Sequence, residues 1–364
     1  MTDITIHVSE PALVGREREY LNQCLDQKQL SGGSFLRRFE IALAERHEVA
    51  HAVACMNGTV ALHLALMGMN LKPGDEVIMP SLTYVATANA VAYCGATPVF
   101  AEIDPFTWNM QPGDVAQKIT RRTVGILPVH LFGNPCDMQA IMDIARLYKL
   151  WIVEDAAEAL GGKYGGYACG TMSDAGIFSF YGNKTITCGE GGAVLTNSQR
   201  IADRMRLRRG QGQSFARRYW HEVLGYNYRM TNLQAALGLA QFECLPWHLN
   251  RRRFVFDTYN DAFRSIGELQ RQITTPDATH ANWMYSVLLP SAEKRDRLMA
   301  NLLDVGIETR PFFTPMHLLP MYERPIGVLP ITEDVAARGL NLPTHAGLSS
   351  EDLNNVINAV LGYL

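Results

Sequence analysis

The stretch FSFYGNKTITCGEGG, residues 178–192, places one lysine between an apolar strand and a glycine-rich turn. The apolar run at 175–181 predicts the strand, and Lys184 follows it in a polar loop. A lysine just beyond a strand reaches a cleft at the edge of a sheet, where its amine can form an imine and then move protons at a substrate carbon. A solvated loop residue is the alternative for any single lysine, so the neighbouring motifs decide.

A second stretch, WIVEDAAEALGG at residues 151–162, ends a short apolar strand in carboxylates. Ligands of open α/β sheets bind at the carboxyl ends of strands, and Asp155 stands at such an end. A carboxylate there can keep the pyridine nitrogen of pyridoxal 5'-phosphate (PLP) protonated, so that the ring accepts electrons. The alternative is that Asp155 caps a helix.

The third candidate is the start of a helix at Asn57-Gly58-Thr59. Free backbone N–H groups and the helix dipole favour a phosphate at such a start. Gly58 allows close approach, Thr59 offers a hydroxyl, and Ser179 could add a second one. Helix capping by Asn57 and Thr59, and a buried strand serine at 179, are the alternatives.

Most of the chain alternates short apolar strands with helices. We expect strands at 76–80, 97–103, 123–129, 150–153, 175–181 and 193–196, and helices at 85–94, 114–119 and 138–148. Short strands separated by helices predict an α/β fold with a mostly parallel sheet covered on both faces.

The length of 364 residues favours about two domains. We expect an N-terminal arm over residues 1–35 with a helix near 17–26, a large cofactor-binding domain over 36–245 and a small C-terminal domain over 246–364. The elements expected in the small domain are a helix at 246–266, a strand at 284–289, a helix at 292–303 and a strand around 307–310.

Composition and motifs argue against several classes of protein. A net charge of −3 gives no basic excess for binding nucleic acid. The seven cysteines form no C-x-x-C pair, so we expect neither zinc nor a disulfide framework, and a reducing cytoplasm suits them. We also expect no signal peptide and no membrane span, because the N-terminus lacks a basic and apolar leader and no apolar run approaches 18 residues.

Other cofactor motifs do not fit. The glycines at 210–215 follow an arginine-rich run rather than a strand, and those at 165–170 are not followed by a lysine, so neither forms a nucleotide-binding loop. We also expect no metal site. His130 follows a strand, and it either points into the cleft or is structural.

In their order and spacing these pieces resemble the sugar aminotransferases of the DegT/DnrJ/EryC1/StrS family. The resemblance covers nearly the whole chain and is carried by residues 32–40, 57–62, 80–89, 154–158, the Lys184 loop and 225–232. It implies a fold-type I PLP-dependent aminotransferase, with a mostly parallel seven-stranded sheet between helices in the large domain and a smaller C-terminal α/β domain. It also implies a homodimer with shared active sites.

The resemblance also implies roles for matching residues. Lys184 matches the family's Schiff-base lysine, and Asp155 matches the partner of the pyridine nitrogen. The other implied cofactor contacts are Gly58, Thr59 and Ser179 at the phosphate, Tyr84 against the ring, Glu158, and Asn227 from the neighbouring subunit. Many members carry His or Gln where Glu158 stands.

The loop at 181–187, together with Glu158, resembles the branch that aminates C4 of GDP-4-keto-6-deoxymannose with glutamate as donor. Candidate groups for binding the nucleotide are Arg229, Arg310 and His317, because a diphosphate needs cationic donors and a base favours aromatic neighbours such as Phe312 and Phe313. The alternative is that both phenylalanines belong to the core and Arg310 to the surface.

Other functions stay open at this point. One is amination of another keto-sugar, UDP- or dTDP-linked, at C3 or C4. Another is a PLP-binding regulatory protein without turnover, which the absence of a helix-turn-helix pattern and of basic charge disfavours. Related sugar dehydratases have histidine where Lys184 stands, so the lysine argues against dehydration.

Overall fold

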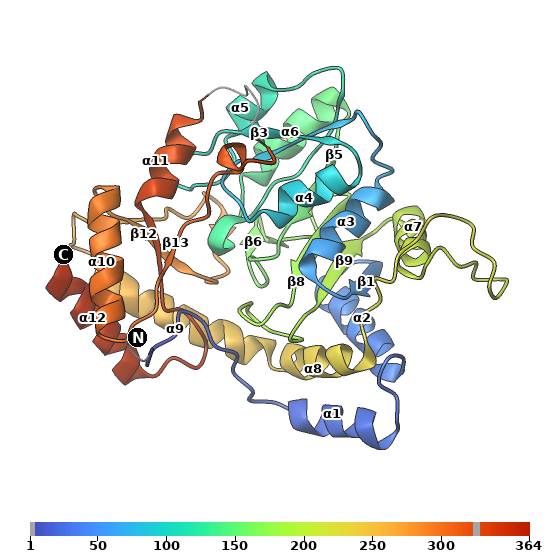
Figure 1. The fold of residues 1–364 in the computed structure, drawn as a ribbon, viewed down its shortest axis with the longest axis horizontal. Coiled ribbons are helices and arrows are strands. Elements are labelled where there is room, and N and C mark those ends of the chain that lie inside the picture. The colour runs from blue at the N-terminus through green and yellow to red at the C-terminus, as the bar shows by residue number, and fades with distance from the viewer. Residues whose placement is uncertain (1–3, 323–327) are drawn as a thin grey trace.

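A seven-stranded sheet forms the centre of the computed structural model, which describes residues 4–322 and 328–364 (Figure 1). Its strands are β1 (His51–Cys55), β2 (Glu76–Pro80), β3 (Thr97–Ala101), β4 (Thr123–Ile126), β5 (Trp151–Asp155), β8 (Ala175–Ser179) and β9 (Gly192–Thr196). They lie in the order β1-β9-β8-β5-β4-β2-β3. β9 runs antiparallel to both neighbours, whereas the other neighbouring pairs are parallel. The mostly parallel seven-stranded sheet is therefore confirmed.

The strands read as apolar runs because helices bury both faces of the sheet. Val77 and Met79 of β2 point to one face, where α3 (Gly58–Gly68), α4 (Ala86–Tyr93) and α7 (Gln199–Arg209) pack. Ile78 points to the other face, which is covered by α5 (Pro112–Gln117) and α6 (Met138–Tyr148) near β4 and β5. The helices α1 (Glu17–Asp26), α2 (Ser34–Arg46) and α8 (Asn232–Glu243) cover that same face near β1 and β9.

A second, antiparallel sheet forms the C-terminal part. Its order is β10 (Gln270–Arg271), β12 (Tyr285–Leu288), β14 (Gly339–Leu342) and β13 (Arg310–Pro311). Three helices pack with it in one core: α9 (Leu245–Ala262), α10 (Ala292–Asp304) and α12 (Ser350–Tyr363). The helix α11 (Pro330–Arg338) and a short 3-10 turn, η1 (Leu131–Gly133), share a core with Leu288 of β12, and a second turn, η2 (Met316–Leu318), packs with the core of the large sheet. A small three-stranded sheet joins β11 (Ala278–Thr279), β6 (Lys163–Tyr164) and β7 (Tyr167–Ala168).

The predicted elements correspond to these with shifted ends, and one was wrong. The expected strand around 307–310 does not form over that range. Ile307 makes only an isolated bridge to Ile6, and pairing with β14 begins at Arg310. Several helices had not been assigned from the sequence, among them α2, α7 and α12. The division of the chain at residues 35 and 245 stays a prediction. Within the described residues, no helix combines the length and apolarity needed to cross a bilayer.

Candidate active site

A cavity of about 500 Å³ opens at the carboxyl edge of the large sheet, facing the small sheet. The ends of β5 and β8, the start of α3 and the turn after β2 supply one side, and the small sheet supplies the other. The sequence candidates that line it are Gly58, Thr59, Tyr84, Asp155, Glu158, Ser179, Lys184 and Arg310. These residues come from five separate segments of the chain and meet in one place, as expected for a ligand site of an open α/β sheet.

Lys184 lies in the loop between β8 and β9, and its side chain is only 14% exposed. Its Nζ is 3.7 Å from Glu158 Oε1 and 4.0 Å from the centroid of the Trp283 ring. Burial lowers the pKa of the Lys184 amine, while the carboxylates of Glu158 and Asp155 oppose that effect. A lysine with a lowered pKa holds more of its amine neutral, which is the form that attacks a carbonyl carbon.

Asp155 ends β5 with its carboxyl group buried. Its Oδ2 accepts a hydrogen bond from Thr87 Oγ1 at 2.8 Å, and its Oδ1 accepts one from the Ala157 N–H at 3.1 Å. Burial raises the pKa of Asp155, and these two hydrogen bonds oppose the rise. A turn follows rather than a helix, so Asp155 does not cap a helix. A cationic N–H in the cavity would complete the environment of this carboxylate.

Glu158 brings a second buried carboxyl group to the cavity. Its Oε2 accepts a hydrogen bond from the Phe132 N–H at 2.8 Å. Burial raises the pKa of Glu158 to about 7, against the opposing effect of the Lys184 ammonium. Glu158 therefore changes its charge near neutral pH, directly beside the amine.

The amino end of α3 forms a cradle for an anion. The Asn57 side chain caps the Val60 N–H at 2.9 Å, and Gly58 and Thr59 begin the helix at the cavity wall. A Cβ atom at position 58 would come within 2.8 Å of Ser179 Cβ, so only glycine keeps the helix start this close to β8. Free N–H groups, a helix dipole and two hydroxyls together suit a phosphate group.

These observations fit PLP. The cradle at α3 would hold the phosphate, Asp155 would face the pyridine nitrogen, and Lys184 would reach the aldehyde carbon. Helix capping explains Asn57 and the packing of α3 against β8 explains the glycine at 58, so the fit to PLP rests on the position of these groups in one cavity with Asp155 and Lys184.

Four sequence candidates lie elsewhere. Asn227 and Arg229 are exposed on a segment that bridges to Gly210 and to Cys55, outside the cavity lining. His317 is buried between Ser81 Oγ at 2.7 Å and Glu333 Oε1 at 3.1 Å, and it does not line the cavity either. His130 has a structural position, because its Nδ1 accepts the Cys136 N–H and its Nε2 contacts Glu154.

The two phenylalanines divide between core and cavity. Phe312 packs in the core against Trp108 and Phe132. Phe313 lines the cavity with its ring 5.7 Å from that of Tyr84. Arg310 lines the cavity as well, and its Nη2 is 3.3 Å from Glu308 Oε1.

Sequence reasoning missed several groups at the site. Thr87 binds Asp155, Trp283 and Asn341 come from the small sheet, and Asn183 precedes the lysine. The Asn183 Oδ1 is buried with no hydrogen-bond partner in the described part of the chain. Asn183 could have been suspected because it adjoins Lys184, whereas the others needed the tertiary structure.

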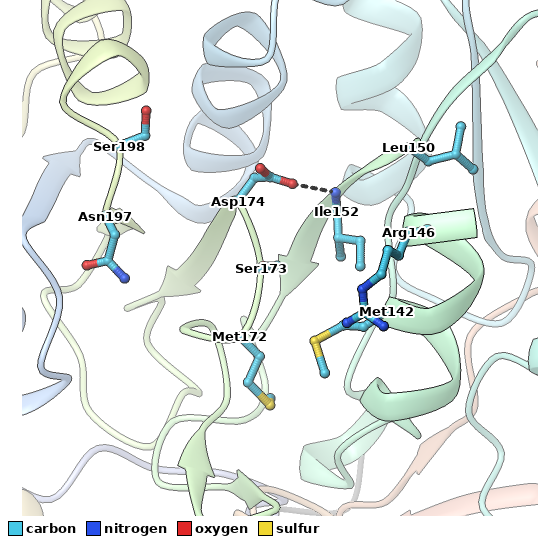
Figure 2. Close-up of a pocket in the computed structure, with 10 residues that line it drawn as sticks. Met142, Arg146, Leu150, Ile152, Met172, Ser173, Asp174, Asn197 and Ser198 are labelled. Carbon is cyan, nitrogen blue, oxygen red and sulfur yellow. Dashed lines mark hydrogen bonds between the residues drawn. The ribbon is translucent and has the colours of Figure 1, made fainter. Parts of the chain in front are cut away.

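A second cavity, of about 480 Å³, lies at the opposite edge of the sheet, where β5 and β8 begin (Figure 2). Figure 2 shows Asp174 bonded to the backbone of Ile152, with Met142 and Arg146 of α6 beside it. Arg146 is already paired with Asp143 at 2.8 Å. Because this cavity contains none of the candidate groups, the carboxyl-edge cavity is the candidate active site.

Known proteins resemble the chain over its whole length. Residues 11–361 match the DegT/DnrJ/EryC1/StrS aminotransferase family. The GDP-perosamine synthase of Escherichia coli O157:H7 is 46% identical over 98% of this chain and 97% of its own, and that of Caulobacter vibrioides is 47% identical over 99% of both. A crystal structure of a DegT DnrJ EryC1 StrS aminotransferase from Brucella abortus is 32% identical, with a TM-score of 0.90 over 96% of this chain and 95% of that one.

The buried Glu158 carboxyl yields a prediction for the cofactor-free protein. Its pKa is raised above the ordinary value of 4.5, so the stability it contributes is present at low pH and is lost as pH rises through about 7. The Glu158→Gln variant lacks this titration. Between pH 5 and pH 8 the wild type should therefore lose roughly 2–3 kcal/mol more of its free energy of unfolding than this variant loses.

Denaturant unfolding at the two pH values measures this difference. Glu190→Gln is the matched control, because Glu190 is an exposed carboxyl group on the same cavity. A difference for Glu158→Gln that stays constant from pH 5 to pH 8 would contradict the assignment.

Proposed function

The chain belongs to the DegT/DnrJ/EryC1/StrS aminotransferase family, and on that basis we propose that it is a PLP-dependent enzyme that converts GDP-4-keto-6-deoxymannose to GDP-perosamine with glutamate as amino donor. One observation carries the aminotransfer chemistry: the Lys184 amine and the buried Asp155 carboxyl line one cavity with the open start of α3. The choice of sugar is supported by identities of 46% and 47% to GDP-perosamine synthases over nearly the full length.

Binding and orientation are the first task of the site residues. PLP, when bound, supplies an aldehyde carbon that bonds to amines and a ring that takes up electrons. Gly58, Thr59 and Ser179 would hold the phosphate, and Tyr84 would contact the ring. Asp155 would keep a proton on the pyridine nitrogen, with its carboxylate oriented by Thr87.

Proton transfer is the task of Lys184. Its Nζ takes the proton from the α-carbon of glutamate and, in the second half of the reaction, gives a proton back, so that the amino group ends on C4 of the sugar. A lowered pKa suits this alternation, because the amine must both accept and release a proton near neutral pH. The neighbouring Glu158 offers a carboxylate that stabilises the ammonium form at 3.7 Å.

Other groups at the cavity wall suit the nucleotide sugar. Arg310 is the cationic group of the small sheet at the cavity wall, suited to a diphosphate, and the rings of Phe313 and Tyr84 offer apolar faces. Asn227 and Arg229 are exposed on one segment, which suits contacts to the active site of a second subunit in a homodimer. The free thiols of all seven cysteines suit a cytoplasmic enzyme of polysaccharide biosynthesis.

The lysine assignment predicts a loss of covalent cofactor attachment. Treatment with borohydride should fix PLP to wild-type protein and, by peptide mass analysis, to Lys184. The variant Lys184→Ala should show no fixed PLP and a turnover lower by at least about 1000-fold, because no other lysine of the described residues lines the cavity. Lys163→Ala is the control, since Lys163 is exposed on β6. PLP fixed to another residue of Lys184→Ala would overturn the assignment.

The substrate assignment predicts selectivity among nucleotides. The enzyme is given PLP and glutamate with a GDP-, UDP- or dTDP-linked 4-keto-6-deoxysugar, and 2-oxoglutarate is measured. The GDP substrate should be preferred by at least about 10-fold in kcat/KM, which corresponds to roughly 1.4 kcal/mol. Turnover of the UDP or dTDP substrate alone would contradict the GDP assignment and leave the aminotransferase intact. Bound PLP without 2-oxoglutarate from any sugar would instead favour a regulatory protein.

A further inference from the structure

Arg252, on α9, carries a guanidinium that is almost completely buried without a carboxylate. Its side chain is 2% exposed, and it takes part in none of the ion pairs of the described residues. Burying a charge without a counter-ion is costly, so such a group is retained only where other polar partners satisfy it. The partners here are backbone carbonyl oxygens, and the Nε has no partner among the described residues.

The guanidinium joins the Lys184 loop to the small sheet. Nη1 donates to the carbonyl oxygens of Trp283 at 2.8 Å and Thr344 at 3.1 Å, at the adjoining ends of β12 and β14. Nη2 donates to the carbonyl oxygen of Lys184 itself at 3.4 Å. One planar group therefore fixes the peptide of Lys184 relative to two strands of the other sheet.

The preceding peptide is held in the same way. The carbonyl oxygen of Asn183 accepts the indole N–H of Trp283 at 2.9 Å and the hydroxyl of Ser9 at 3.2 Å. Three segments distant in the sequence thus hold two consecutive peptides at Lys184, and Arg252 is the charged member of the set. The Trp283 ring that donates to Asn183 also lies 4.0 Å from the Lys184 Nζ.

The charge of Arg252 acts on the amine as well as on the backbone. Burial is the main cause of the lowered pKa of Lys184. The carboxylates of Glu158 and Asp155 oppose this effect, and the charge of Arg252 lowers the pKa further. These groups come from the end of β5 and the turn after it and from α9. A fixed cation near a lysine amine is one of the known ways to favour its neutral form.

We propose that Arg252 is a positioning residue for the reaction: it holds the Lys184 peptide in place against the small sheet and fixes a positive charge beside that peptide. This inference rests on the proposed role of Lys184. It assigns to α9 a part in the chemistry although no atom of Arg252 lines the cavity.

The test separates geometry from charge with two variants. Arg252→Lys keeps the charge but cannot donate to three carbonyl oxygens in one plane, whereas Arg252→Gln keeps some donors and loses the charge. The matched control is Arg251→Gln. Arg251 lies next to it on α9 and donates to the carbonyl oxygens of Ala346 at 3.1 Å and Leu348 at 2.8 Å, away from Lys184.

The measurements are kcat and KM for glutamate, the melting temperature, and the pH midpoint of the visible absorbance of PLP-loaded enzyme. Arg252→Lys should lose at least about 10-fold in kcat with KM and pH midpoint near the wild type. Arg252→Gln should lose kcat too and raise the pH midpoint by roughly 0.5–1 unit, because the repelling charge is gone. Arg251→Gln should match the wild type in kcat and midpoint at a similar melting temperature.

Variants at 252 that equal the Arg251 control in both kcat and pH midpoint would overturn the inference. If Arg252→Gln does not fold, Arg252→Lys decides: a reduced kcat at unchanged midpoint supports the positioning role, and an unchanged kcat refutes it. Lys184→Ala distinguishes this failure from that of the proposed function. If that variant loses the visible band while the 252 variants behave as the control, only the Arg252 inference fails; if it keeps the band, both fail.

Discussion

The burial of one amine beside two carboxyl groups is the constraint on which the site depends. Lys184, Asp155 and Glu158 are removed from water at the floor of the cavity, and burial alone would neutralise each of them. Burial lowers the pKa of the amine and raises those of the two carboxyl groups, that of Glu158 to about 7. The opposite charges of the amine and the carboxylates reduce these shifts in part. A cofactor with a cationic ring nitrogen and an anionic phosphate would complete this arrangement, because Asp155 and the start of α3 offer groups of opposite polarity to those charges.

The topology of the sheet brings these groups together. β5 and β8 are parallel neighbours, so Asp155 and Ser179 come to the same edge. β9 then returns antiparallel, and the loop between β8 and β9 therefore lies wholly at that edge and carries Lys184. β1 runs antiparallel to β9, so it ends at the same edge, and α3 begins there because it follows β1 directly. The small sheet closes the cavity from the other side with Trp283, Arg310 and Asn341.

Local sequence patterns predicted part of the site and of the fold, and the remaining residues and helices needed the tertiary structure. Lys184, Asp155 and Gly58 were found because each follows or precedes an apolar run, and strand ends in an open α/β sheet converge. Arg252, Trp283 and Thr87 gave no local signal, because each acts through a contact to a residue far away in the sequence. The helix α7 was missed since only Ile201, Ala202 and Met205 of it are buried, which leaves a weak apolar stripe among arginines. His317, expected to donate to a bound diphosphate, is instead hydrogen-bonded to Ser81 and Glu333.

Aminotransfer at this site depends on the proposed role of Asp155, which is to keep a proton on the cofactor's ring nitrogen. Asp155→Asn tests it most directly, because the amide oxygen can still accept the hydrogen bond from Thr87 or Ala157 while the charge is lost. PLP-loaded variant and wild type are mixed with glutamate in a single turnover, and the rate of α-proton removal is followed with α-deuterated glutamate as a check on that step. The account predicts a folded variant that binds PLP and removes the proton at least about 100-fold more slowly. Removal of the proton at close to the wild-type rate would contradict it.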